Sequence, residues 1–260
     1  MDRSLPGRDS QGQTAARGAV QSLRPAGDGT CAEPYPAAEA ADTAAEHTPL
    51  SGVVLTGGRS RRLGQDKARL RLWGPGGPTL LEATVAHLAA VCDEVLVVSA
   101  SLEDGPPPAG TRLVADRFPG GGALGGIYTG LAEAAHPFAL AVACDMPFLQ
   151  PALLRYMAGR PRDYDVLIPR RRASDASEPG ADALQLYLEP LHAIYGRPCR
   201  EPMRVLLERG ERQIIRFFPA VRVRYLAPDE IAPWDPAGLA FRNINTPQDL
   251  EEVRGILGKR

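Results

Sequence analysis

The chain has 260 residues and a formal net charge of −1, a balance that argues against a general nucleic-acid binder, which is usually basic. It contains no run of about 18 apolar residues, so we expect no transmembrane helix and no membrane partner. The four cysteines, Cys31, Cys92, Cys144 and Cys199, lie far apart without Cys-x-x-Cys or zinc spacing. We therefore expect free thiols in a reducing cytosol, and a cytoplasmic protein.

The first 49 residues differ in composition from the rest. They hold eleven alanines, five glycines and five prolines, but only three residues from the group Leu, Ile and Val. Such a segment buries too little apolar surface to offset the entropy lost on ordering. The sequence therefore predicts a disordered tail over 1–49 and a single domain over 50–260. The tail also lacks the apolar core of a signal peptide.

A glycine-rich and basic loop follows the first predicted strand, Val53-Val54-Leu55. Between 56 and 67 it contains Gly57, Gly58, Gly64, Arg59, Arg61, Arg62 and Lys67. Glycine lets a ligand approach backbone N–H groups, and basic side chains neutralise phosphate charge. The loop fits neither a Walker A motif nor the dinucleotide fingerprint Gly-x-Gly-x-x-Gly. It reads as a cradle for a nucleoside triphosphate, with a solvated basic turn as the alternative.

Strand and helix patterns then alternate along the chain. A capping box of Thr79 and Glu82 begins a helix. Further strands are expected at 95–98, 113–114, 138–143, 166–168, 190–195 and 221–225, the last a half-exposed edge strand. Further helices are expected at 127–136, after Pro151, at 201–209 and after Thr246-Pro247. The glycine cluster 120–126 is expected to be a loop, and 170–188 a surface insertion or mobile loop. Alternating elements of this kind predict a mostly parallel sheet covered by helices.

Two aspartates are expected at the carboxyl ends of strands, where α/β sheets bind ligands. Asp145 follows a very apolar strand, where a carboxylate is costly unless it is paired or bound to a cation. Beside a triphosphate it is a candidate Mg²⁺ ligand, because Mg²⁺ takes one or two carboxylates plus phosphate oxygens. The alternative is a helix-capping aspartate. Asp116 is a candidate nucleotide-binding group, with an ordinary turn aspartate as its alternative.

Other reactive residues point to no further chemistry. No Ser-His-Asp or Cys-His pair has supporting context. His192 is expected to be a hydrogen-bonded core or rim histidine, and Cys144 a small packing residue. The run Arg170-Arg171-Arg172 reads as a solvated loop that could also hold an anionic substrate. A triphosphate, one cation and fixed basic groups favour phosphoryl or nucleotidyl transfer without a protein nucleophile.

Five motifs in order resemble the molybdenum cofactor guanylyltransferase (MobA) group of the MobA-like nucleotidyltransferases. They are Leu55 to Lys67, Gly122 to Gly126, Cys144 to Leu149, Pro190 to Tyr195 and Asn243 to Leu250. The resemblance implies a Rossmann-like three-layer α/β/α sandwich with a mostly parallel central sheet. It also implies transfer of GMP from GTP to the phosphate of molybdenum-bound molybdopterin, with release of pyrophosphate and Mg²⁺ as cofactor. A monomer is expected, with molybdoenzymes or their chaperones as further partners.

The resemblance also implies roles for individual residues. Arg62, Lys67 and Asp145 would be catalytic, with Asp145 holding the Mg²⁺ ion. Contacts to the guanine nucleotide would come from Leu55, Thr56, Gly57, Gly58, Lys67, Ser99, Asp116 and Asp145.

Three positions depart from the family pattern. Thr56 replaces an alanine, Ala123 replaces a proline, and Ser99 stands where some members have a nucleotide-contacting asparagine. The last change puts one guanine or ribose contact in question. Two other functions stay open: a cytidylyltransferase or other nucleotidyltransferase with a different phosphorylated acceptor, and a non-catalytic nucleotide-binding protein that delivers a cofactor.

Overall fold

The computed structural model describes residues 48–56, 66–100, 106–171 and 188–258. The predicted tail lies almost wholly outside the described residues. The same holds for the glycine loop from Gly57 to Gln65 and for residues 172–187 of the insertion predicted over 170–188. The domain boundaries therefore stay a prediction.

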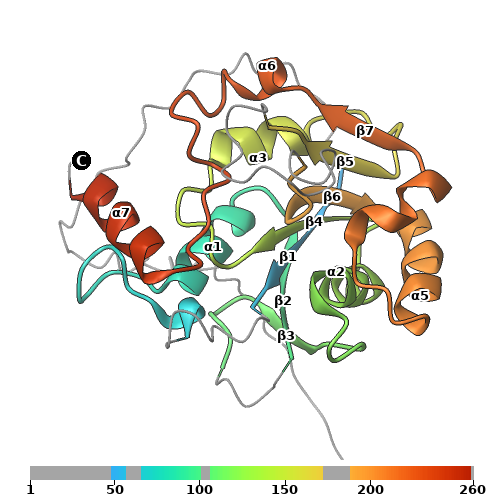
Figure 1. The fold of residues 1–260 in the computed structure, drawn as a ribbon, viewed down its shortest axis with the longest axis horizontal. Coiled ribbons are helices and arrows are strands. Elements are labelled where there is room, and N and C mark those ends of the chain that lie inside the picture. The colour runs from blue at the N-terminus through green and yellow to red at the C-terminus, as the bar shows by residue number, and fades with distance from the viewer. Residues whose placement is uncertain (1–47, 57–65, 101–105, 172–187, 259–260) are drawn as a thin grey trace, which may run out of the picture. The chain divides into compact units, whose positions relative to one another are not determined.

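A seven-stranded sheet forms the centre of the fold (Figure 1), with the strand order β3-β2-β1-β4-β6-β5-β7. The strands are β1 (Ser51–Leu55), β2 (Glu94–Ser99), β3 (Arg112–Ala115), β4 (Phe138–Ala143), β5 (Val166–Pro169), β6 (His192–Gly196) and β7 (Val223–Leu226). Only β6 runs against its neighbours, pairing antiparallel with β4 and β5. The other pairs are parallel, so the predicted mostly parallel sheet is confirmed.

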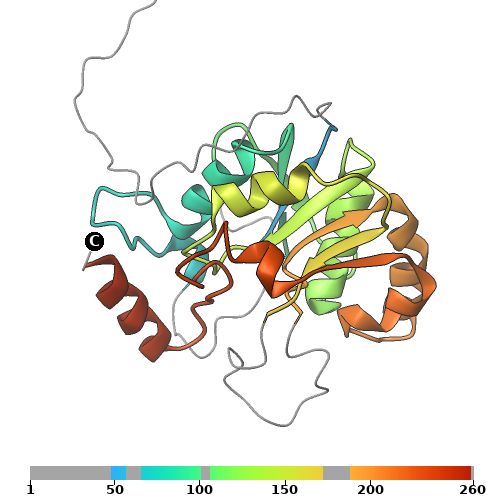
Figure 2. The ribbon, with the colours of Figure 1, turned by 90° about the horizontal axis from the view of Figure 1, so that it is seen from above.

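Helices cover both faces of the sheet (Figure 2). One face packs against α2 (Gly122–Glu133), α5 (Arg200–Glu208) and the 3₁₀ segment η4 (Ile214–Ala220). The other packs against α1 (Leu80–Ala89), α3 (Pro151–Ala158) and α6 (Pro228–Ile231). Two apolar cores result, one on each side, which confirms the three-layer α/β/α prediction. Among the described residues no helix is long and apolar enough to cross a membrane.

Helix α2 begins at Gly122, so the predicted loop over 120–126 is wrong from Gly122 onward. The glycines serve close packing instead. A Cβ atom on Gly130 would lie 2.4 Å from Cγ1 of Val53, and one on Gly126 would lie 3.0 Å from Cδ2 of Leu55. Packing against β1 thus requires glycine on this helix face and outweighs the low helix propensity of glycine.

Helix α7 (Pro247–Leu257) belongs to a third, smaller core. Its buried residues Leu250 and Val253 pack with Leu70 and Leu80, near the 3₁₀ turn η1 (Lys67–Arg69). The predicted start is confirmed, since Thr246 Oγ1 accepts a hydrogen bond from the backbone N–H of Asp249 at 3.1 Å. The capping box of Thr79 and Glu82 is likewise present at α1. A second 3₁₀ turn, η3 (Arg197–Cys199), leads into α5.

Candidate active site

A cavity of about 240 Å³ opens at the carboxyl ends of β1, β2 and β4. Strand β1 lies between β2 and β4, and the chain crosses from β3 through α2 to reach β4. This reversal of strand order is the point at which α/β sheets bind ligands. The cavity is lined by Leu55, Thr56, Asp66, Lys67, Val98, Ser99, Ala100, Asp116, Gly122, Ala123, Gly126, Ala143, Cys144, Asp145, Leu191, Asn243 and Asn245.

Lys67 is held between two segments that are remote in sequence. Its Nζ atom lies 2.9 Å from Asp145 Oδ2 and donates a hydrogen bond to Asn245 Oδ1, also at 2.9 Å. Lys67 stands in η1, Asp145 follows β4, and Asn245 precedes α7. The small core under α7 fixes η1 and α7 against each other. The ammonium group is therefore placed at the cavity by three separate elements.

The two carboxylate oxygens of Asp145 have different surroundings. Oδ2 faces Lys67, whereas Oδ1 is buried and has no hydrogen-bond partner among the described residues. A buried, unpartnered carboxylate oxygen is costly unless a cation or donor reaches it. A divalent cation would satisfy this atom. Within the described ranges no group of three or more His, Cys, Asp or Glu side chains could hold a metal ion, so Asp145 would share such an ion with ligand oxygens.

Asp116 lines the same cavity but also has a clear structural role. Its Oδ1 atom accepts hydrogen bonds from Thr129 Oγ1 at 2.9 Å and from the backbone N–H of Phe118 at 3.0 Å. These bonds tie the turn after β3 to α2. These contacts support the interpretation of Asp116 as a turn aspartate. A contact between Asp116 and a nucleotide stays a prediction.

The end of β1 offers fewer backbone groups than expected. The Thr56 N–H donates to the carbonyl of Val98 at 3.1 Å, and its Oγ1 hydroxyl donates to the same carbonyl at 3.0 Å. The Leu55 carbonyl accepts a hydrogen bond from the Cys144 N–H at 3.2 Å. Both residues nevertheless line the cavity. The resemblance implies that Leu55, Thr56 and Gly57 contact the nucleotide through backbone groups, and the sheet already uses one of these groups, the Thr56 N–H.

Ser99 is buried at the end of β2 and also lines the cavity. Its carbonyl accepts a hydrogen bond from the Asp116 N–H at 2.9 Å. Gly57, Gly58 and Arg62 lie outside the described residues, so their predicted roles stay predictions. The described candidates Leu55, Thr56, Lys67, Ser99, Asp116 and Asp145 are all brought to one cavity.

Three polar cavity residues had no role assigned from the sequence. Asp66 caps η1 by accepting from the Ala68 N–H at 3.0 Å. Asn245 contacts Lys67, and Asn243 carries a buried side-chain oxygen without a partner. The motif Asn243 to Leu250 was the available signal for the two asparagines. The contact of Asn245 with Lys67, and the place of Asn243 in the same cavity, depend on long-range folding and cannot be read from that motif.

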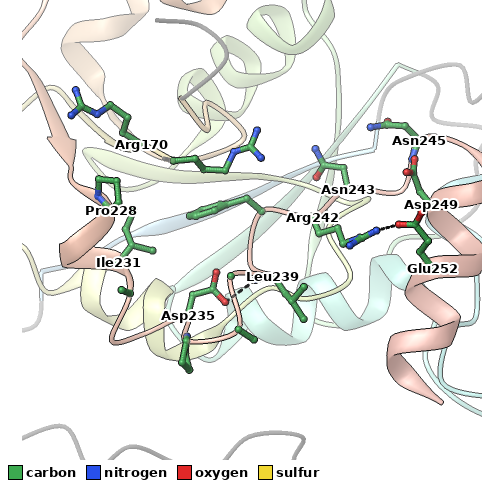
Figure 3. Close-up of a pocket in the computed structure, with 16 residues that line it drawn as sticks. Arg170, Pro228, Ile231, Asp235, Leu239, Arg242, Asn243, Asn245, Asp249 and Glu252 are labelled. Atoms are coloured by element: carbon green, nitrogen blue, oxygen red, sulfur yellow. Dashed lines mark hydrogen bonds and ion pairs between the residues drawn. The ribbon is translucent and has the colours of Figure 1, made fainter. Parts of the chain in front are cut away.

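A second cavity, of about 920 Å³, adjoins the first (Figure 3). It lies beyond the ends of β5 and β7, and it shares Asn243 and Asn245 with the smaller cavity. Figure 3 shows these two asparagines at one end and Arg170 toward the other. The wall also includes Arg171, Phe241 and Arg242. The two asparagines therefore mark a junction between two ligand-sized spaces.

His192 and Cys144 lie in the core, as expected of packing residues. Burial lowers the pKa of His192 to about 3. Its ring packs edge-on against Phe241, and neither ring nitrogen has a hydrogen-bond partner, so the expected hydrogen bonding of this histidine is wrong. Burial also raises the pKa of the Cys144 thiol to about 12. A thiol with that pKa is a poor nucleophile.

The fold and the cavity define an α/β protein of the nucleotide-binding class. Residues 52–224 match the model of the MobA-like NTP transferase domain. A "probable molybdenum cofactor guanylyltransferase" of Chloroflexus aggregans is 43% identical over 82% of the chain and 97% of that relative. A relative of the same name from Pelotomaculum thermopropionicum is 37% identical over 78% of the chain and 91% of its own length. The chain therefore belongs to the MobA-like NTP transferase family, in its molybdenum cofactor guanylyltransferase group, which confirms the resemblance.

Solved structures agree on the fold. The molybdopterin-guanine dinucleotide biosynthesis protein A of Archaeoglobus fulgidus is similar with a TM-score of 0.65 and 25% identity, covering 81% of this chain and all of that one. The 2-C-methyl-D-erythritol 4-phosphate cytidylyltransferase of Thermus thermophilus is similar with a TM-score of 0.57 at 19% identity, covering 80% of this chain and 98% of that one. The second likeness concerns the fold alone.

Proposed function

We propose that the protein transfers GMP from GTP to the phosphate of molybdenum-bound molybdopterin, forming molybdopterin guanine dinucleotide and releasing pyrophosphate. The observation that carries this proposal is the Lys67–Asp145 ion pair in the smaller cavity, where Lys67 also contacts Asn245, a residue that lines both cavities. A nucleotidyl transfer needs a donor and an acceptor side by side, with charge-neutralising groups between them. The names of the relatives support the choice of guanine nucleotide and acceptor.

The smaller cavity is the proposed donor site. Lys67 would bind phosphate oxygens of GTP, and Arg62 would stabilise negative charge that develops on the α-phosphate. Leu55, Thr56, Gly57 and Gly58 would line the nucleotide. Since the Thr56 N–H already donates within the sheet, the glycines after it are better suited to donate backbone N–H groups.

Ser99, at the end of β2, and Asp116, after β3, would contact the base or ribose from that side of the smaller cavity. Both residues are already tied into the sheet edge by the hydrogen bond from the Asp116 N–H to the Ser99 carbonyl. They would therefore form a rigid wall against which the nucleoside packs.

Asp145 would hold a Mg²⁺ ion through Oδ1, the oxygen that lacks a partner. The ion would neutralise charge on the triphosphate and on the departing pyrophosphate. Lys67 contacts the other oxygen of the same carboxylate. Asp145 would thereby orient both the Mg²⁺ ion and the Lys67 ammonium group toward the phosphates. Lys67 would in turn fix the side chain of Asp145.

The larger cavity is the proposed acceptor site. Its arginines suit an anionic acceptor, and Phe241 offers an aromatic surface for a fused ring. Asn243 and Asn245 line both cavities. In the proposed reaction their amides would lie where the acceptor phosphate meets the α-phosphate of GTP. No protein nucleophile is required, because the acceptor phosphate oxygen attacks directly.

A nucleotide panel tests the proposal. Purified protein is mixed with Mg²⁺, molybdate-loaded molybdopterin and each of the four nucleoside triphosphates, and pyrophosphate release is measured. GTP should give rapid release that depends on the acceptor. Release with CTP but not with GTP would point to a cytidylyltransferase. No release with any nucleotide would favour a non-catalytic binding protein.

A further inference from the structure

Two adjacent arginines stand at the acceptor side of the larger cavity. Arg170 and Arg171 follow β5, and both line the wall. Arg170 is exposed and is labelled in Figure 3. Arg171 is less exposed, and its Nε atom forms an ion pair with Oε1 of Glu189. The two neighbours thus differ in that Arg171 is held by a carboxylate from the chain segment that leads into β6.

The Glu189 side chain is only 10% exposed, and burial raises its pKa to about 7. Such burial is costly, and a buried ion pair often adds no net stability compared with apolar residues. The backbone of this segment does not depend on the carboxylate. The Glu189 N–H donates to the Pro169 carbonyl, and the His192 N–H donates to the Glu189 carbonyl, each at 3.0 Å. The side chain is therefore free to serve Arg171.

The acidic residues that line the cavity have partners of their own. Asp235 accepts hydrogen bonds from the N–H groups of Leu239 and Ala240, both at 3.0 Å. Asp249 accepts from the N–H groups ahead of α7, and Glu252 pairs with Arg242. Figure 3 shows the Arg242–Glu252 contact at the α7 side of the cavity. These carboxylates are therefore engaged by other groups, whereas Arg170 and Arg171 enter the cavity wall from the end of β5.

We propose that Glu189 is a positioning residue that holds the Arg171 guanidinium in the cavity wall, where Arg171 binds an anionic group of the acceptor. The proposal rests on the proposed function, because it concerns the acceptor of that reaction. It assigns acceptor specificity to the end of β5, whereas the donor is bound at the ends of β1 and β4. Arg171 contacts the acceptor, and Glu189 acts only through Arg171.

Steady-state kinetics with GTP and molybdate-loaded molybdopterin test both roles. Arg171→Gln should raise the KM for the acceptor about tenfold or more, the scale of a lost charge-assisted contact. Glu189→Gln should raise the same KM, and Glu189→Asp should restore part of the loss. The dissociation constant for GTP, measured by titration calorimetry, should stay within twofold. Glu201→Gln breaks an exposed Glu–Arg pair on α5 and is the matched control.

The double variant separates positioning from an independent role. If Glu189 acts through Arg171, adding Glu189→Gln to Arg171→Gln should not raise the acceptor KM further. If Glu189→Gln raises the acceptor KM of Arg171→Gln by the same factor as it raises the KM of the unaltered protein, the positioning role is overturned. An unchanged acceptor KM in Arg171→Gln would overturn the whole inference, as would a Glu189→Gln variant that loses thermal stability but keeps its acceptor KM. Failure of the unaltered protein to transfer GMP would instead count against the proposed function.

Discussion

Lys67 Nζ lies 2.9 Å from Asp145 Oδ2, while the second oxygen of that carboxylate is buried without a partner. One carboxylate thus faces a fixed ammonium group on one side and offers an open coordination position on the other. The ion pair does more than balance charge, because it fixes the side-chain rotation of Asp145 and with it the direction of Oδ1. In the proposed reaction, a Mg²⁺ ion and Lys67 would then act on the same phosphates.

Replacing Asp145 with asparagine keeps the size of the side chain but removes its charge. We expect turnover to fall roughly 10²–10³-fold, the cost of losing one preorganised electrostatic group. The Mg²⁺ concentration needed for half-maximal GTP binding should also rise. Asp163→Asn, at an exposed aspartate that pairs with Arg224, is the matched control. Unchanged Mg²⁺ dependence in Asp145→Asn would remove this residue from the metal site.

The Lys67–Asn245 contact should couple α7 to nucleotide binding. Lys67→Ala should weaken GTP binding about tenfold or more, because a charged phosphate contact is lost. Asn245→Ala should weaken it less, since only the support of Lys67 is removed. In the double variant the two losses should not add, with a coupling energy of about 0.5–3 kcal/mol. Additive losses, measured by titration calorimetry with GTP, would show that the two side chains act independently.

Asp116 should matter for stability as well as for binding. Asp116→Ala removes the acceptor for the Thr129 hydroxyl and the Phe118 N–H. We expect the free energy of unfolding to fall by about 1–3 kcal/mol, the cost of leaving such groups unpaired. Urea unfolding followed by circular dichroism measures this loss. A variant of unchanged stability that no longer binds GTP would show that the carboxylate serves the ligand alone.

His192 should make the protein sensitive to mild acid. Burial lowers its pKa from the ordinary 6.5 to about 3 in the folded state. The unfolded chain therefore takes up a proton below about pH 6.5 while the folded state stays neutral, so stability falls as the pH drops from about 6.5 to 3. His192→Leu should reduce this slope. Urea unfolding at pH 7.5 and 5.0 measures how much the free energy of unfolding of each protein changes with pH. An equal change in both proteins would contradict the role of His192.

Local sequence patterns predicted most elements of the fold. The continuous apolar run Phe138–Ala143 coincides with β4, and the capping signals at Thr79 and Thr246 mark the starts of α1 and α7. The start of α2 was misplaced because glycine has low helix propensity. Its glycine face is required by contact with Val53 and Leu55 of β1, and a contact of this kind between distant segments has no local signature.

In the candidate site, too, local sequence features were predicted and contacts between distant segments were not. Asp145 was predicted because a carboxylate at the end of an apolar strand needs a partner or a cation. Lys67 was predicted because it belongs to the glycine-rich basic loop after β1, and the family resemblance gave both residues their roles. Their direct pairing, and the role of Asn245 in it, depend on α7 packing against η1 through the third core. The second cavity was not predicted either, because its wall combines the ends of β5 and β7 with the segment that precedes α7.

The reversed strand β6 lies between β4 and β5, so those two strands run parallel but are not neighbours. Their carboxyl ends are therefore two strand spacings apart, about 10 Å in a regular sheet. Asp145 follows one of these ends and Arg170 follows the other. The separation between the two ligand sites is thus fixed by backbone hydrogen bonds across β6, whatever the lengths of the loops around them. A substrate pair that reacts here must match that spacing.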